Sequence, residues 1–175
     1  MTIMPGLIED STDLKILILF AMRKLGLPAK IDDITQMTVG LPGTVVSYFD
    51  VAAALGALVD TGHLTLELAK YELTEKGVRN GEATESDVPY SLRYHSERIA
   101  LDLHSKMMRE KLIKTSRTLI RSGGYEVEMK LSDGKRDMLF LRVIAANEKQ
   151  AEQIEETFYE RAEAVFSVIM DTLIS

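Results

Sequence analysis

The chain has 175 residues, of which 46% are hydrophobic and 27% are charged, with a net charge of −6 at pH 7. This balance is typical of a globular protein of one large or two small domains, and it excludes a disordered chain. The sequence contains no cysteine, which excludes disulfides and thiolate metal sites.

The first predicted element is a helix over residues 12–25, whose apolar residues recur with a helical period and which ends at Gly26. A short second helix is expected at about 33–37, and a third runs from Ser47 or Tyr48 to Asp60. The acidic start of the chain lacks the apolar core of a signal peptide, and the apolar run 14–22 is too short to span a bilayer. We therefore expect a cytoplasmic protein with no membrane contact.

Two very short strands are predicted after the third helix, at 64–67 and 71–73, with residues 68–70 as the tip between them. The segment 73–77 (LTEKG) is expected to close the domain as a turn. This order of helices and hairpin within about 80 residues is the pattern of a winged helix-turn-helix, whose third helix would enter the major groove of DNA. An unrelated small helical domain with a hairpin is the alternative.

The third predicted helix carries no Lys or Arg. No side chain on its outward face can make the bidentate guanine contact that Arg supplies, and two aspartates there would repel phosphate. The candidate DNA-binding residues are therefore the hydroxyl donors Thr44, Ser47 and Tyr48 at the helix start, and Lys70 at the hairpin tip. A winged helix used for protein contacts stays open as an alternative. The expected outward set is Ser47, Asp50, Ala53, Gly56, Ala57 and Asp60.

Beyond a polar connector at 81–89, helical structure is expected from Tyr90 to about Ser122, with a break near Thr115 left open. Eight basic residues concentrate in 91–121 against three acidic ones. They fit either an auxiliary phosphate-binding face or an ordinary solvated helix face, and the interleaved acids favour the second. The basic residues are Arg93, Arg98, Lys106, Arg109, Lys111, Lys114, Arg117 and Arg121.

A hairpin is predicted next, with strands at 125–131 and 137–145 joined at Asp133-Gly134. The second strand carries apolar residues on both of its faces, which predicts that both faces are covered or that the strand is central in a sheet. A final helix begins after Asn147 and becomes nearly apolar beyond Arg161, which favours dimerisation over packing in its own core. The predicted dimer residues are Phe158, Val165, Phe166, Ile169, Met170 and Leu173.

No catalytic or metal-binding motif occurs in the sequence. The three histidines are not at metal-ligand spacing, and no Gly-rich phosphate loop or nucleophile elbow is present. We therefore expect no enzyme activity, no catalytic residue, no metal and no cofactor.

Three segments, at 16–28, 51–77 and 123–154, resemble a bacterial family of domains of unknown function whose members are regarded as winged-helix transcriptional regulators, broadly similar to the PadR and MarR groups. The resemblance extends from about Leu7 to Ile174, and it implies double-stranded DNA and a second copy of the chain as partners. It brings no ligand, operator or catalytic residue with it.

The sequence thus predicts an α+β protein in which a winged helix-turn-helix domain (1–82) precedes a domain for dimerisation or sensing (88–175). The second domain would consist of a long helix, a β-hairpin and a C-terminal amphipathic helix. The predicted function is a homodimeric DNA-binding transcriptional regulator. The alternative is a module for protein contacts without DNA binding.

Overall fold

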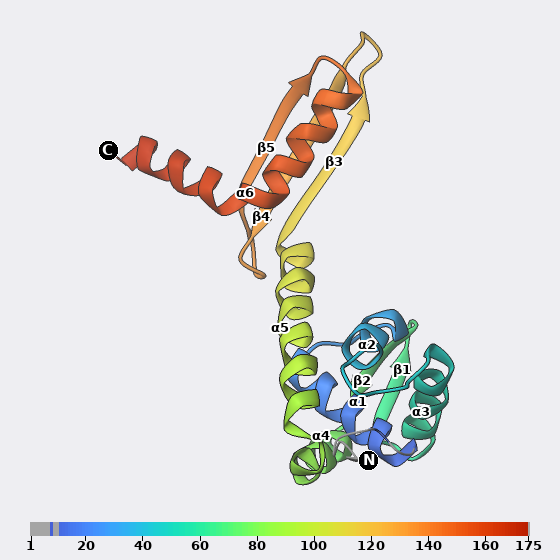
Figure 1. Ribbon diagram of the computed structural model, residues 1–175. Coiled ribbons are helices and arrows are strands. Elements are labelled where there is room, and N and C mark those ends of the chain that lie inside the picture. The colour runs from blue at the N-terminus through green and yellow to red at the C-terminus, as the bar shows by residue number, and fades with distance from the viewer. Residues whose placement is uncertain (1–7, 9–10, 175) are drawn as a thin grey trace. The chain divides into compact units, whose positions relative to one another are not determined.

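The computed structural model describes Ile8 and residues 11–174, drawn in colour in Figure 1. The described chain forms six α-helices, one short 3-10 helix and two antiparallel sheets, one of two strands and one of three. It divides into two compact units, Met1–Ser105 and Lys106–Ser175. The predicted α+β class is confirmed.

The N-terminal unit is built around its first helix, whose apolar side chains are buried nearly all round. Among them, Leu17, Ile18 and Phe20 are buried against the helices that follow. Burial of such side chains contributes roughly 1.5–3 kcal/mol each, so this helix anchors the unit. The elements of the unit are α1 (Ser11–Leu25), α2 (Ile31–Thr38), α3 (Tyr48–Asp60), β1 (Leu64–Glu67), β2 (Lys70–Leu73), α4 (Glu75–Ala83), the 3-10 helix (Glu85–Asp87) and most of α5 (Tyr90–Leu112).

The hairpin of β1 and β2 follows α3 directly and pairs antiparallel from Leu64↔Leu73 to Glu67↔Lys70. A third backbone segment joins it: the amide and carbonyl of Ala29, between α1 and α2, exchange hydrogen bonds of 2.9 and 2.8 Å with Tyr71. The hairpin is thereby tied to the start of α2, and its far end stays exposed.

The predicted closing turn at LTEKG is wrong, because Thr74 caps a helix there. The Thr74 hydroxyl accepts from the amide of Gly77 at 3.1 Å and donates to the carbonyl of Gly62 at 2.7 Å. Gly77 sits where a Cβ atom would lie 2.1 Å from the carbonyl oxygen of His63. Only glycine fits that position, so α4 can pack against the end of α3.

The prediction of a helix from Tyr90 to Ser122 is also wrong beyond Leu112. Val88, just before α5, and Leu92 of its first turn are buried with Leu17 and Phe20 of α1, but α5 ends at Leu112 and the chain continues as a strand. The two predicted strands therefore find their missing neighbour within their own chain, as β3 (Ile113–Leu119). The break that was left open near Thr115 lies at Leu112.

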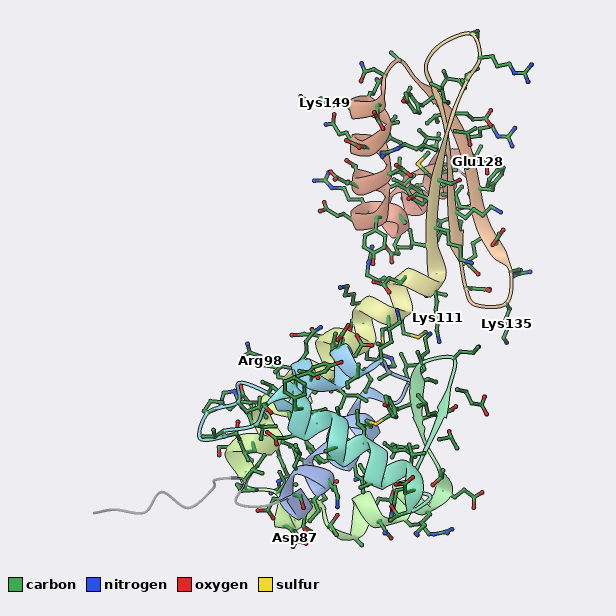
Figure 2. All side chains as sticks on the ribbon, turned by 90° about the vertical axis from the view of Figure 1, so that its right-hand side faces the viewer. Asp87, Arg98, Lys111, Glu128, Lys135 and Lys149 are labelled. Carbon is green, nitrogen blue, oxygen red and sulfur yellow. The ribbon has the colours of Figure 1, made fainter. Side chains whose placement is uncertain are left out.

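The C-terminal unit is a three-stranded antiparallel meander, β3–β4–β5, covered on one face by the last helix. Its further elements are β4 (Tyr125–Ser132), β5 (Asp137–Ala145) and α6 (Glu148–Ile174). The predicted alternation in β4 is confirmed, because Val127, Met129 and Leu131 are buried under α6. The opposite face of the sheet is open, as Glu128 on it shows (Figure 2).

The prediction that the last strand is central or covered on both faces is wrong. β5 is an edge strand, and its outward residues, among them Met138, Phe140 and Ile144, are exposed. Phe140 lies between the cations of Lys130 and Arg142, whose charged groups are 5.2 and 5.8 Å from its ring centroid. These cations shield an apolar side chain that no second layer covers.

The last helix is fixed at its start and kinked near its middle. As predicted, it begins after Asn147, which caps it by accepting from the amide of Gln150 at 2.9 Å, and the Gln150 side chain accepts from the amide of Ala146. Arg161 has non-helical angles (φ −127°, ψ 19°), and beyond it α6 turns away from the sheet (Figure 1).

Two arginines tie α6 to the rest of its unit. Arg117 of β3 lies within 3.0 to 3.8 Å of three α6 carboxylates, those of Glu148, Glu152 and Glu155. Arg109 pairs with Glu163 at 3.0 Å and also donates to the carbonyl of Tyr159. The first half of α6 is therefore held by both apolar packing and ion pairs, and one further ion pair holds Glu163 just beyond the kink.

Candidate nucleic-acid interface

The start of α3 is closed by a reciprocal cap. Ser47 precedes the helix, and its hydroxyl accepts from the amide of Asp50 at 3.3 Å while it donates to the Asp50 carboxylate at 2.6 Å. The same carboxylate accepts from the amide of Ser47 at 2.9 Å. These are the bonds of a capping box, with aspartate in the role usual for glutamate.

This cap changes what the helix start can bind. The hydroxyl and the backbone amide of Ser47 hold the pKa of the Asp50 carboxyl below its usual range, so the group is ionised at neutral pH. Free N–H groups and the helix dipole would attract an anion here, but the Asp50 carboxylate already occupies part of that position. A phosphate would have to approach an existing negative charge.

The other predicted hydroxyl donors differ in availability. Thr44 donates its hydroxyl hydrogen to the carbonyl of Leu41 at 2.9 Å. Tyr48 is exposed, and its hydroxyl makes no hydrogen bond with any residue that the structure describes. Of Thr44, Ser47 and Tyr48, only Tyr48 can donate to a partner without giving up an internal bond.

The surface around the helix start is apolar, which the sequence reasoning missed. Val45 is 92% exposed and Phe49 is 81% exposed, and the Phe49 ring meets that of Tyr48 edge to face with centroids 6.1 Å apart. Isolated exposed apolar residues are ordinary, but large adjacent ones indicate a contact surface. The signal was present in the sequence as VVSYF, of which only Ser47 and Tyr48 were singled out, as hydroxyl donors.

The hairpin tip is a strained turn that presents an apolar side chain. Leu68 and Ala69 have φ of 50° and 60°, a region that costs L-residues roughly 1–2 kcal/mol each. Two-residue hairpin turns with both φ positive favour Asn-Gly. Leu68 is nevertheless 98% exposed at this tip. Lys70 is the first residue of β2 instead of a tip residue, and its cross-strand neighbour is Glu67.

The exposed face of α3 is made of small and acidic residues, as predicted, except that Ala57 is half-buried. Ala53 and Ala57 line a shallow groove of about 450 Å³ between α3 and the start of α1. Lys15 of α1 also lines it and brings a cation near this side of α3. A backbone or a flat apolar surface can approach such a face closely.

The end of α3 is joined to α4 through His63. Its Nδ1 lies 2.8 Å from the Thr61 hydroxyl, and its Nε2 lies 2.6 Å from the side-chain amide nitrogen of Asn80. Burial, and then the nearby charge of Lys76, lower the pKa of the His63 imidazole. A neutral ring that donates from Nδ1 and accepts at Nε2 satisfies both contacts.

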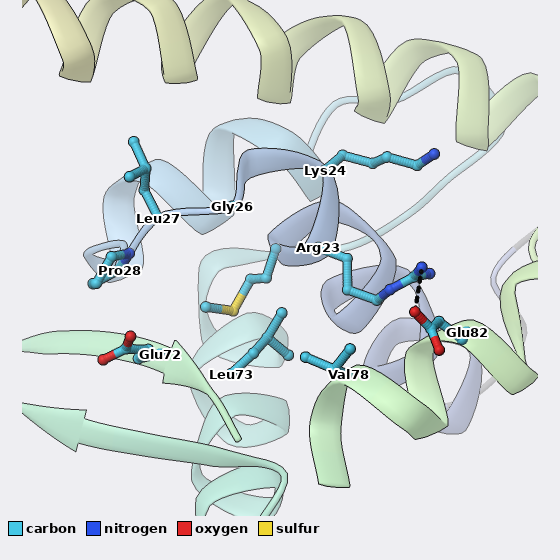
Figure 3. A pocket seen from close by; sticks show the side chains of 10 residues that line it. Arg23, Lys24, Gly26, Leu27, Pro28, Glu72, Leu73, Val78 and Glu82 are labelled. Atoms are coloured by element: carbon cyan, nitrogen blue, oxygen red, sulfur yellow. Dashed lines mark hydrogen bonds and ion pairs between the residues drawn. The ribbon is translucent and has the colours of Figure 1, made fainter. Parts of the chain in front are cut away.

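A second hollow, of about 530 Å³, lies between the end of α1, β2 and α4 (Figure 3). Both cations of its lining are engaged in ion pairs. Arg23 donates to Glu82, which also lines the hollow, at 3.4 Å and to Glu85, outside the lining, at 2.8 Å. Lys24 lies 3.2 Å from Glu97, which is also outside the lining.

The eight basic residues of 91–121 do not lie on one helix, which contradicts their assignment to a single helix face. Five lie on α5, Lys114 and Arg117 lie on β3, and Arg121 lies in the turn that follows. Arg98 and Lys111 of α5 are labelled in Figure 2. Arg109 and Arg117 are engaged by the carboxylates of α6 described above.

The predicted dimer residues lie on both sides of the kink in α6. Phe158 is 3% exposed and belongs to the core of its own unit, where Val165 and Phe166 also pack. Ile169 and Met170 are half-buried, and Leu173 is 74% exposed. The exposed apolar surface is therefore concentrated near the end of the helix.

The described part of the chain contains neither a membrane-spanning helix nor a cluster of metal ligands. None of its helices combines the length and the apolar character needed to cross a lipid bilayer. Residues 8 and 11–174 also hold no group of three or more His, Asp or Glu side chains arranged to bind a metal ion.

These features define a protein of two α+β units, the first a helical unit with an exposed hairpin and the second a helix-covered sheet. The chain belongs to the family described as Domain of unknown function (DUF4364), which matches residues 14–173. The searches of curated proteins and of solved structures returned no match.

Proposed function

We propose that the N-terminal unit is a winged helix-turn-helix and that the protein is a transcriptional regulator that binds double-stranded DNA as a homodimer. The proposal is carried by the arrangement of α3 and the hairpin. The helix exposes small residues such as Ala53 and Gly56, and the β1–β2 hairpin follows it with an exposed tip. The bridge from Ala29 to Tyr71 supplies the short third strand of a winged helix.

The likeness to PadR and MarR regulators, and a cytoplasmic location, are parts of this proposal. No catalytic group, metal or cofactor has a role in it. The cap of Ser47 and Asp50 shifts the expected contacts away from the helix start. Groove contacts would come from the small face of α3 and from Tyr48, while Lys70 and Lys15 would meet phosphates. Leu68 at the tip could enter a minor groove as an apolar wedge.

The test is selection of bound duplexes from a random pool at low salt, followed by a salt titration of the enriched site. Lys70→Glu should weaken binding to all sequences and lower the slope of log K against log salt by about one. Lys149→Glu is the matched control, because it makes the same charge change on α6 of the other unit (Figure 2). Absence of duplex binding at low salt would overturn the proposal.

A second candidate function is a module for protein contacts, and one observation favours it. Val45, Phe49 and Leu68 are large apolar side chains exposed at the places where a DNA-binding winged helix usually offers polar ones. This candidate predicts no salt-dependent duplex binding. A photo-cross-linking residue at Phe49 should instead attach a protein partner, and one at Asp60, also exposed on α3, should not.

A further inference from the structure

The second half of α6, residues 162–174, carries an apolar stripe that its own unit covers only in part. The stripe repeats at helical spacing through Ala162, Val165, Phe166, Ile169, Met170 and Leu173. Val165 and Phe166 pack against the core of the unit, but the stripe continues past that core to Leu173. A helix with such a stripe is stable in water only when another surface covers it.

A groove of about 390 Å³ lies beside this helix, between the first half of α6 and the edge strand β5. Its floor is apolar and is formed by Met129, Leu141, Ile154, Phe158 and Val165. Its polar lining consists of Gln150, Gln153 and Thr157, all of them uncharged. The groove can thus receive an apolar helix without burying a charge from its own lining.

The helix cannot fill this groove in its own chain, because the kink at Arg161 turns it away from the sheet (Figure 1). Val165 nevertheless belongs to both features, since it lines the groove and lies on the apolar stripe. The stripe and the groove therefore form one continuous apolar surface on each copy. Two copies related by a two-fold axis can each place the stripe in the groove of the other, which is the reciprocal contact of an isologous interface.

We propose that residues 162–174 of one copy lie in the groove between α6 and β5 of a second copy, and that the second copy returns the same contact. The segment carries two charged side chains, Glu163 and Asp171, at positions outside the stripe. The seated helix also lies beside the open backbone edge of β5, which would otherwise offer unpaired strand groups to another chain.

This inference rests on the homodimer of the proposed function and specifies its geometry, but it does not require DNA binding. The occupant is a second copy because one chain carries both halves of the contact. An unrelated protein would need one surface that fits the groove and another that covers the stripe.

The first test compares two surface variants by light scattering after gel filtration. Ile169→Glu with Leu173→Glu places charges in the stripe beyond the unit's own core, so the fold is retained while the mass falls from dimer to monomer. Val168→Glu is the matched control, because Val168 is exposed on the other side of the helix and should leave the dimer intact. A wild-type monomer at tens of micromolar, or a dimer that survives the double variant, would overturn the inference.

The second test uses the absence of native cysteine, which makes any introduced thiol unique. Thr157→Cys in the groove and Met170→Cys in the stripe are made in separate chains, mixed, and treated with a short bismaleimide. A cross-link between the two kinds of chain is expected, whereas Glu156→Cys, which is exposed outside the groove, should cross-link poorly with Met170→Cys.

The outcomes distinguish this dimer geometry from the proposed DNA-binding function. A dimer without the Thr157–Met170 cross-link overturns this geometry and leaves the regulator standing. The cross-link without duplex binding overturns DNA recognition and leaves this geometry standing. A monomer contradicts the homodimer in both.

Discussion

The first and the last helix of this chain bury their side chains to very different extents within one copy. In α1, eight of 15 residues are buried within a single copy, whereas in α6 only three of 27 are buried. Both helices are amphipathic, so the difference lies in what surrounds them. Helices α2, α3, α4 and the first turns of α5 enclose α1, but α6 has only one sheet face, and its apolar stripe continues beyond that face after Phe166. The N-terminal unit is complete in one copy, and the C-terminal unit leaves apolar surface uncovered.

The largest expected effect tests whether the core of the N-terminal unit is formed entirely within one copy. Phe20→Ala removes a ring that is fully buried against α5 and should lower the free energy of unfolding of this unit by about 3–5 kcal/mol. Hydrogen exchange followed by mass spectrometry would show the loss in residues 11–105 alone. The loss should not depend on protein concentration, because no second copy contributes to this core.

The matched control is Phe49→Ala, which removes the same side chain from an exposed position on α3. Its effect on unfolding should be within about 0.5 kcal/mol of zero. If Phe20→Ala also lowered protection throughout residues 106–174, the two units would unfold together and the contrast between α1 and α6 would fail.

The next effect concerns the ion pairs that hold α6. Arg117→Met keeps the length of the side chain but leaves Glu148, Glu152 and Glu155 facing one another without a cation. The C-terminal unit should lose about 1–3 kcal/mol, since hydrogen bonds to charged groups contribute amounts of this order. Thermal unfolding at low and high salt would measure the loss, which should shrink as salt screens the carboxylates.

Arg142, on the outer face of the same sheet, provides the comparison with Arg117. Arg142→Met removes an arginine that pairs with Glu128 at 2.6 Å and with Glu126 at 3.7 Å, but that is exposed on the open side of the sheet. Its loss should lower the melting temperature less than that of Arg117. Equal effects would show that α6 gains nothing from the more enclosed cluster.

The sequence was informative where local chemistry decides the structure. The helix start at Asn147, the hairpin at 64–73 and the alternation of β4 follow from residue type and spacing, and the structure confirms them. Helix α4 was missed because Gly77 reads as a stop signal. In the structure this glycine lets α4 pack closely against the backbone of His63, a contact that only the tertiary fold reveals.

Strand β3 was missed for another reason. Its sequence IKTSRTL follows a long helix without Gly or Pro, and its cations look like a continued polar helix face. The available signal was the density of β-branched residues at Ile113, Thr115 and Thr118. The candidate site was harder still, because whether the Ser47 hydroxyl is free or used depends on the position of Asp50, which residue spacing only suggests.

The smallest expected effect is a pH dependence of the N-terminal unit through His63. Its neutral ring donates from Nδ1 to the Thr61 hydroxyl, which itself donates to the carbonyl of Ala57 at 2.7 Å, and it accepts at Nε2 from Asn80. A proton on Nε2 would face the Asn80 amide hydrogens and the charge of Lys76. The fold therefore favours the neutral form, which is why the pKa of His63 lies below its ordinary value of 6.5.

The sign of the effect follows from that direction. Because the pKa is lower in the folded state than in the unfolded chain, the stabilisation is fully present above pH 6.5 and is lost as the pH falls through the folded value. The melting temperature of the N-terminal unit should decline slightly more between pH 7.5 and about pH 5 than in His63→Gln, whose amide oxygen can accept from Asn80 without titrating. Identical declines in the two proteins would show that the carboxylates, which titrate in both, account for the whole dependence. The C-terminal unit contains no histidine, so its own response in this range serves as the internal reference.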